Sequence, residues 1–472
     1  MKRILTIVSA GLLIMIMSIP TYAVDISFGG LIRPRYIANN FPIGAGVGTH
    51  VNHSDHGYSF VDQRVDISMT AKISDDLKGV IVLTNSNNSL HTLSYPQWGR
   101  NGVNRSNNAP QGTTGAGGAV SHTHSYYMDD TNSTFFGELN FRNAYIDFNL
   151  PNPFLPLNFK VGRQQVKVGH GIVFSGSPDA LAITSKYKNI DFGFWTAKIS
   201  EGSITESDDW DMYTLWAKCS PIANHTFGAT FIYEYGKSGA FRDQQFGYPN
   251  GLALANFTED VKFRPWIISL TADGTMDPIT YRAEFAYQGG EIKDADANGG
   301  NWDLSAWAAM AGIDYNLSSI CKKPAKVGVE VAYGTGEEDG SNDGSYNGFL
   351  MHDPEWWYAD LMSDVVGLYL LNGLNNRAYV KVSGEMKPMD RITCNIAYLY
   401  NWAPETNSEG KYDGHHNFMG HEFDIASTYD IFKNLNFELK FAYLIAGDYF
   451  DDVDGDSPTD PYGITGTLLF KF

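Results

Sequence analysis

The chain of 472 residues contains few cysteines and has no long apolar run beyond its first 23 residues. Its three cysteines, Cys219, Cys321 and Cys394, are too scattered for a disulfide framework, and no Cys-x-x-Cys-His run could attach a haem. A membrane-spanning helix needs about 18 or more consecutive apolar residues, and the longest candidate, Val365 to Leu371, stops at Asn372-Gly373. The sequence therefore excludes a disulfide-rich miniprotein and a helical membrane protein.

Basic residues are outnumbered, with 34 lysines and arginines against 53 acidic residues and a net charge of −19. This balance makes nucleic acid a poor partner. The motifs Gly-x-Ser-x-Gly and His-Glu-x-x-His, which would mark a serine or zinc hydrolase, are also missing. The sequence thus predicts a protein that is not an enzyme and has no catalytic residues.

The N-terminus has the pattern of a secretory signal peptide. Lys2 and Arg3 precede an apolar run from Ile4 to Ile19, and Thr21-Tyr22-Ala23 provides the small-residue cleavage pattern. An uncleaved helix is the alternative, but the run is short and ends at Pro20. We therefore expect two parts, a signal peptide over residues 1–23 and a single exported domain over residues 24–472.

Apolar and polar residues alternate with a period of two through much of the exported part. The whole chain is rich in aromatic residues (14%) and contains 48 glycines. In residues 61–73, apolar side chains such as Val65, Ile67 and Met69 alternate with polar ones such as Arg64 and Asp66. A strand between lipid and water needs this pattern, because successive side chains point to opposite faces. A secreted soluble β-protein is the alternative interpretation of the composition.

The alternation predicts 18 strands, an even number, and the connections between them alternate in length. Every second connection is short, such as Lys188-Asn189, whereas the others are mostly longer and include 91–133 and 337–374. Short periplasmic turns and long external loops are typical of outer-membrane proteins. The fold class we expect is therefore all-β, an up-and-down transmembrane antiparallel barrel in the bacterial outer membrane. The predicted strands span 26–38, 58–74, 78–90, 134–149, 157–168, 179–187, 190–200, 208–219, 225–237, 260–273, 279–291, 303–316, 325–336, 375–387, 391–403, 418–430, 435–448 and 461–472.

The last strand ends in an aromatic residue, Phe472, after an alternating apolar face that begins at Tyr462. It resembles the closing-strand signature that the barrel-insertion machinery of the outer membrane recognises. We expect Phe472 to contact that machinery, and the barrel wall to contact outer-membrane lipid and lipopolysaccharide.

Three short motifs resemble a known family of outer-membrane proteins. They are Gly162-Arg163-Gln164, Gly169-His170-Gly171 and Asp179-Ala180-Leu181, and together they are similar to the alginate-export type. The resemblance in motifs covers residues 157–200. It implies an 18-stranded barrel through which anionic saccharides or small carboxylates diffuse along an arginine-lined lumen.

Charged residues on the predicted inward faces are the candidate pore lining. Rings or ladders of charge in a water-filled lumen concentrate counter-ions and orient solutes. Acidic residues such as Asp62, Glu284 and Glu330 share these faces, so a structural salt-bridge ladder is the alternative. The candidate pore-lining residues are Arg33, Arg35, Arg64, Arg142, Arg163, Arg282, Arg377 and Lys381.

Metal binding is a secondary hypothesis, and no other cofactor is expected. Asp294, Asp296 and Asn298 occupy positions one, three and five of a calcium-type loop with Gly299 at position six, but Ser305 stands where a bidentate Glu belongs. His50, His53 and His56, with His122 and His124, could bind a transition metal, although loop histidines are usually unliganded.

The favoured function is passive passage of small hydrophilic solutes, with an anionic or saccharide-like character. A barrel that sheathes a periplasmic cytochrome and an outer-membrane lipid-acting enzyme remain as alternatives.

Overall fold

The computed structural model describes twelve ranges of the chain. The predicted signal peptide, residues 1–23, lies outside them. Within the described residues, no helix is long and apolar enough to cross a membrane. The described ranges are 24–40, 58–85, 140–150, 155–200, 209–237, 262–293, 301–337, 345–349, 359–361, 373–406, 416–450 and 460–472.

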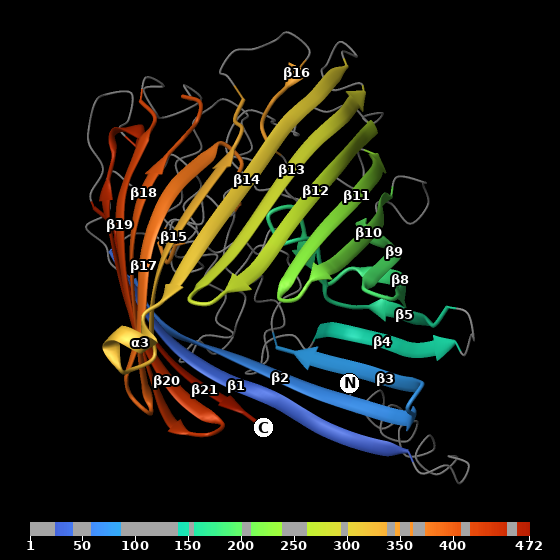
Figure 1. Ribbon diagram of the computed structural model, residues 1–472, viewed down its shortest axis with the longest axis horizontal. Coiled ribbons are helices and arrows are strands. Elements are labelled where there is room, and N and C mark those ends of the chain that lie inside the picture. Colours follow the sequence, from blue (N-terminus) through green and yellow to red (C-terminus); the bar gives the residue numbers. More distant parts are fainter. Residues whose placement is uncertain are drawn as a thin grey trace, which may run out of the picture.

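Eighteen long strands pair in chain order, each antiparallel to the next, and the first closes against the last (Figure 1). They are β1 (Asp25–Asn39), β2 (Tyr58–Ser74), β3 (Leu77–Thr84), β4 (Asn140–Leu150), β5 (Leu157–Arg163), β8 (Asp179–Tyr187), β9 (Ile190–Ser200), β10 (Trp210–Ile222), β11 (His225–Lys237), β12 (Lys262–Met276), β13 (Ile279–Lys293), β14 (Trp302–Asn316), β15 (Ala325–Gly334), β17 (Arg377–Met389), β18 (Ile392–Trp402), β19 (Phe418–Phe432), β20 (Leu435–Ala446) and β21 (Tyr462–Lys471). The predicted all-β barrel of 18 strands is confirmed.

Short elements complete the described chain. β6 (Val166–Lys167) and β7 (Ser175–Gly176) form a small hairpin apart from the wall, and β16 (Ser345–Tyr346) pairs parallel with β14. A single helical turn, α3 (Ser318–Cys321), and a 3-10 turn, η3 (Asp448–Phe450), lie in connections.

β1 and β21 pair with each other, so neither strand has a free edge. In lipid, every backbone amide must find its hydrogen-bond partner within the protein, and a closed barrel meets this requirement. The register pairs Leu31 with Lys471 and Tyr36 with Gly466. At the chain end, the Phe472 amide donates to the Gly30 carbonyl at 3.1 Å, and the Gly30 amide donates to the Phe472 carbonyl at 2.9 Å.

The two faces of the wall are inverted relative to a soluble sheet. Apolar side chains on one parity are exposed, as with Phe28, Ile67 and Leu215, while charged residues on the other parity, such as Asp62 and Glu284, are buried. Exposed apolar side chains face lipid, and the buried polar face surrounds the lumen. The alternation in β2 follows this rule, as the sequence predicted.

Six connections at one end of the barrel are two-residue turns, as expected for tight hairpins. Lys188 and Asn224 adopt φ values of 53° and 65° there, which such turns require. We call this the short-turn end, and the opposite end the long-loop end.

The predicted strand bounds agree closely, and the largest differences occur at the long-loop end. Strands 58–74, 179–187, 190–200 and 225–237 have the predicted limits. The predicted strand 157–168 stops at Arg163, because the chain then leaves the wall and turns into the barrel. Gly162, with a φ of 119°, precedes this departure.

Candidate functional site

The inner wall of β1, β2 and β4 carries a group of arginines that we call the arginine sector, made of Arg33, Arg35, Arg64 and Arg142 with Asp62 and Asp66. Arg35 binds Asp62 through two hydrogen bonds, Nε at 3.3 Å and a terminal nitrogen at 2.6 Å. Arg64 binds Asp66 at 2.5 Å, and Arg142 reaches the same carboxylate at 3.3 Å. Among the described residues, the arginine sector thus holds four arginines and two aspartates.

The strand register explains why these side chains converge. Arg33 lies directly opposite Arg64, and Arg35 directly opposite Asp62, on adjacent strands. Asp66 is paired in register with Thr84, whose hydroxyl donates to it at 2.7 Å. The sequence placed these residues on the inward face, but the register alone decides which charges are neighbours.

A second charged group lies across β13, β14, β15 and β17. Arg282 binds Asp314 at 2.8 Å and Glu330 at 2.5 Å, and the Tyr379 hydroxyl donates to Glu330 at 2.7 Å. The guanidinium crosses Gly312, where a Cβ would lie 2.9 Å from its central carbon. Here the predicted lumen cation is held by two carboxylates, as in a structural ion-pair ladder.

Two other candidates on β17 also lie on the inward parity. Arg377 is almost fully buried and contacts the Met419 sulfur. Lys381 lies directly opposite Glu330 in the register with β15.

Arg163 lies on the outward parity, which corrects the expectation that it lines the pore. It pairs in register with Asp179, and its guanidinium binds that carboxylate at 2.8 Å. Asp179 shares its face with exposed Tyr187, while the neighbouring Ala180 is buried on the inner face. The predicted strand continued to residue 168. The sequence alone therefore did not show that β5 ends at Arg163, or that the side chain of this arginine is on the outward face.

An inward-folded segment, residues 164–178 between β5 and β8, occupies part of the lumen. Glu284 on β13 is buried, and one of its oxygens accepts the backbone amide of His170 at 2.6 Å. Its other oxygen accepts the Ser269 hydroxyl at 2.6 Å. Gly169 permits this approach, because a Cβ there would lie 2.2 Å from a Glu284 oxygen.

His170 also contributes its ring to this contact. Its Nε2 lies 3.4 Å from Asp273, and burial lowers the pKa of the imidazole. Ser269 donates to Glu284, so it is not placed against the His170 ring as an activated nucleophile would be.

A second inward segment, residues 359–361, is bound by acidic residues of β19 in the same way. The Leu361 amide donates to Glu422 at 2.5 Å, and the Asp360 amide donates to Asp424 at 3.3 Å. Lys440 on β20 binds the Asp360 carboxylate at 3.1 Å. Acidic wall residues in both places are thus engaged in holding chain segments inside the barrel.

Apolar packing secures both segments against the wall. Ile172, Val173 and Phe174 are fully or almost fully buried, and the Phe174 ring lies 6.0 Å from that of Trp195. The same apolar cluster includes Leu361 from the second segment. The sequence analysis expected a water-filled lumen and did not predict these contacts. The apolar run Ile172-Val173-Phe174, which follows a glycine-rich turn, was the signal that could have indicated them.

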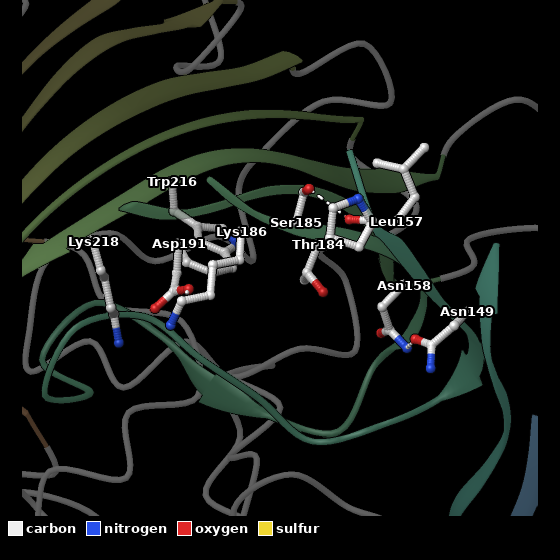
Figure 2. A pocket seen from close by; sticks show the side chains of 10 residues that line it. Asn149, Leu157, Asn158, Thr184, Ser185, Lys186, Asp191, Trp216 and Lys218 are labelled. Atoms are coloured by element: carbon white, nitrogen blue, oxygen red, sulfur yellow. Dashed lines mark hydrogen bonds and ion pairs between the residues drawn. The ribbon is translucent and has the colours of Figure 1, made fainter. Parts of the chain in front are cut away.

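A pocket of about 450 Å³ lies on the inner wall near the short-turn end, formed by β4, β5, β8, β9 and β10. Figure 2 shows Trp216, Lys186, Asp191 and Lys218 on one side and Leu157, Asn158 and Asn149 on the other. Lys186 and Asp191 form an exposed ion pair at 3.3 Å. The pocket therefore combines an indole ring, two ammonium groups and two amides.

The metal hypotheses concern residues that the structure does not describe. Asp294, Asp296 and Asn298, and the five loop histidines, lie outside the described ranges. Within those ranges, no group of three or more histidine, cysteine, aspartate or glutamate side chains could hold a metal ion. Calcium binding stays a prediction.

This architecture defines a porin-type channel of the bacterial outer membrane. The sequence profile of the alginate export family matches residues 120–460, and the chain belongs to that family. The resemblance seen in the motifs of residues 157–200 is confirmed. No curated protein matches the chain significantly.

Solved structures show the same fold at low sequence identity. OccK8 (OprE) of Pseudomonas aeruginosa aligns with a TM-score of 0.53 and 11% identity, over 95% of this chain and 98% of its own. OccK9 (OpdG) of the same organism has a TM-score of 0.52 and 10% identity, with the same coverage. OccK1 (OpdK), also from Pseudomonas aeruginosa, has a TM-score of 0.52 and 9% identity over the same shares.

Proposed function

We propose that the barrel is a passive, anion-preferring channel for small hydrophilic solutes that carry a carboxylate, including acidic saccharides. The arginine sector carries this proposal, because its four arginines outnumber its two aspartates. Elsewhere on the inner wall, Glu284, Glu422 and Asp424 accept backbone amides of inserted segments. Their charge is therefore partly offset by donors that the chain itself supplies.

The pocket near the short-turn end supports the same solute class. Trp216 offers an apolar ring face, against which a sugar or aromatic ring can stack. Lys186 and Lys218 can bind a carboxylate, and the amides of Asn149 and Asn158 can bind hydroxyl groups. A solute with a ring and one carboxylate would use all three kinds of contact.

The inserted segments favour a channel over the alternatives. Residues 164–178 and 359–361 take up lumen space that a cytochrome would need in a sheath. The arrangement of Ser269, Glu284 and His170 supports no catalytic step, and we propose that transport involves none.

The test is the reversal potential of the purified full-length barrel in a planar bilayer with a KCl gradient. We expect the wild type to prefer chloride over potassium. In Arg33→Gln/Arg64→Gln the ratio of chloride to potassium permeability should fall toward one, by roughly twofold or more, because two positive charges of the lumen are lost. Arg163→Gln is the matched control, since that arginine is outward-facing. A wild-type reversal potential near zero would contradict the proposal.

A further inference from the structure

Charged residues follow the outward face of the wall at the long-loop end, where adjacent strands place them side by side. Arg163 pairs with Asp179, Asp179 with Lys198, and Lys198 with Asp211, across β5, β8, β9 and β10. Each of these residues lies within three positions of the long-loop end of its strand. Opposite charges alternate here, so this part of the row is internally compensated.

Further along the row, on β11, β12 and β13, three lysines lie directly opposite one another. Lys237 pairs in register with Lys262, and Lys262 pairs with Lys293. All three have the outward parity of the exposed Tyr233, Ile268 and Tyr287. We call Lys237, Lys262 and Lys293 the lysine row; Figure 1 shows their three strands side by side.

Like charges directly opposite on neighbouring strands destabilise a sheet. Arg264 lies two residues from Lys262 on the same face and adds a fourth cation. Glu291 binds both Arg264, at 3.2 Å, and Lys293, at 3.1 Å, and Asp303 lies directly opposite Glu291 on β14. Among the described residues, four cations of the patch lie beside these two carboxylates.

The position of the lysine row along its strands shows which layer of the membrane surrounds it. On β12, Lys262 lies four residues beyond Trp266, whose ring packs 5.6 Å from that of Tyr287 on β13. Outward aromatic rings mark the boundary between the acyl chains and the headgroups. The lysine row therefore lies beyond that boundary, at the level of the headgroups at the long-loop end.

We propose that the lysine row, with Arg264, is a binding site for a phosphorylated headgroup of an outer-leaflet glycolipid of the lipopolysaccharide type. A phosphate group carries the charge and acceptor oxygens that three adjacent ammonium groups and a guanidinium can share. Binding would relieve the repulsion between Lys262 and Lys293, which lie directly opposite each other. The site is on the outside of the barrel, so it is independent of what passes through the lumen.

Native mass spectrometry of the full-length barrel in detergent, titrated with purified lipopolysaccharide, tests this site. We expect Lys262→Gln/Lys293→Gln to bind roughly thirtyfold more weakly than the wild type, because each surface lysine contributes to anionic lipid binding. Lys262→Arg/Lys293→Arg should retain binding. Lys323→Gln/Lys433→Gln, which removes two exposed lysines at the short-turn end, should bind like the wild type.

Other ligands distinguish a site for a phosphorylated headgroup from nonspecific binding of lipids and from a site for free anions. Dephosphorylated lipopolysaccharide and phosphatidylcholine should bind weakly, and inorganic phosphate should not displace bound lipopolysaccharide at equal concentration. Equal affinity of the wild type and the double glutamine variant, equal binding of the dephosphorylated lipid, or displacement by inorganic phosphate would each overturn the proposal. Heat-modifiable migration and unchanged bilayer conductance establish that each variant is folded.

Discussion

Replacing Glu284 with alanine should release the inward-folded segment 164–178 from the wall. The change removes the acceptor of the His170 amide, which binds at 2.6 Å and joins the segment to the wall. It also removes the acceptor of the Ser269 hydroxyl, but Ser269 belongs to the wall strand β12, so that bond does not hold the segment. A hydrogen bond to a charged group contributes about 1.5–3 kcal/mol, and one such bond joins the segment to Glu284. We therefore expect docking to weaken by about 2 kcal/mol.

Apolar contacts should keep the segment docked for most of the time. Ile172, Val173 and Phe174 are buried in the wild type, and each buried side chain of this size contributes about 1.5–3 kcal/mol. The variant should therefore fold normally but undock more often. A loss of about 2 kcal/mol corresponds to a roughly thirtyfold larger undocked population.

Hydrogen exchange of the barrel in detergent measures this population at the amides around residue 170. We expect exchange there to be roughly thirtyfold faster in Glu284→Ala, with unchanged exchange in distant strands. Glu284→Gln keeps one carbonyl acceptor and should be intermediate. Glu438→Gln is the matched control, because Glu438 is on an inward face and binds Thr428 of the wall, not an inserted segment. Unchanged protection at residue 170 in Glu284→Ala would refute the assigned role of this carboxylate.

Three further predictions concern the ion pairs, the chain end and pH. Arg35→Met should lower the free energy of unfolding by about 3 kcal/mol in urea titrations, because it leaves the almost fully buried Asp62 unpaired. Arg35→Met/Asp62→Leu should recover most of this loss. A double variant as unstable as Arg35→Met would contradict the pairing. Deleting Phe472 should lower the stability of the barrel in detergent and the amount of folded barrel in the outer membrane, because it removes two backbone hydrogen bonds to Gly30. Phe472→Ala keeps both bonds and should lower the stability in detergent less than the deletion does. Lowering the pH to about 5 should weaken docking of residues 164–178: the pKa of His170 is below its ordinary value in the docked state, so the released segment takes up the proton first, and docking is lost as pH falls. Hydrogen exchange at the amides around residue 170, compared between neutral pH and a pH of about 5, measures this effect. His170→Gln should reduce it, and an equal pH response in that variant would contradict the role assigned to the imidazole.

The sequence by itself determined the wall of the barrel. Alternation depends on nearest neighbours along one strand, so residues 61–73 reveal their lipid and lumen faces without any knowledge of the partner strand. Two-residue turns such as Lys188-Asn189 are equally local, and their spacing indicated the strand number and the direction of the chain.

Only the tertiary structure decided which charges meet and which segments enter the lumen. Arg35 meets Asp62 and Lys237 meets Lys262 because of register, which joins residues far apart in the chain. The inserted position of His170 depends on Glu284, 114 residues away, and the outward position of Arg163 depends on where β5 ends. These are long-range contacts, and their energies do not appear in any local pattern of the sequence.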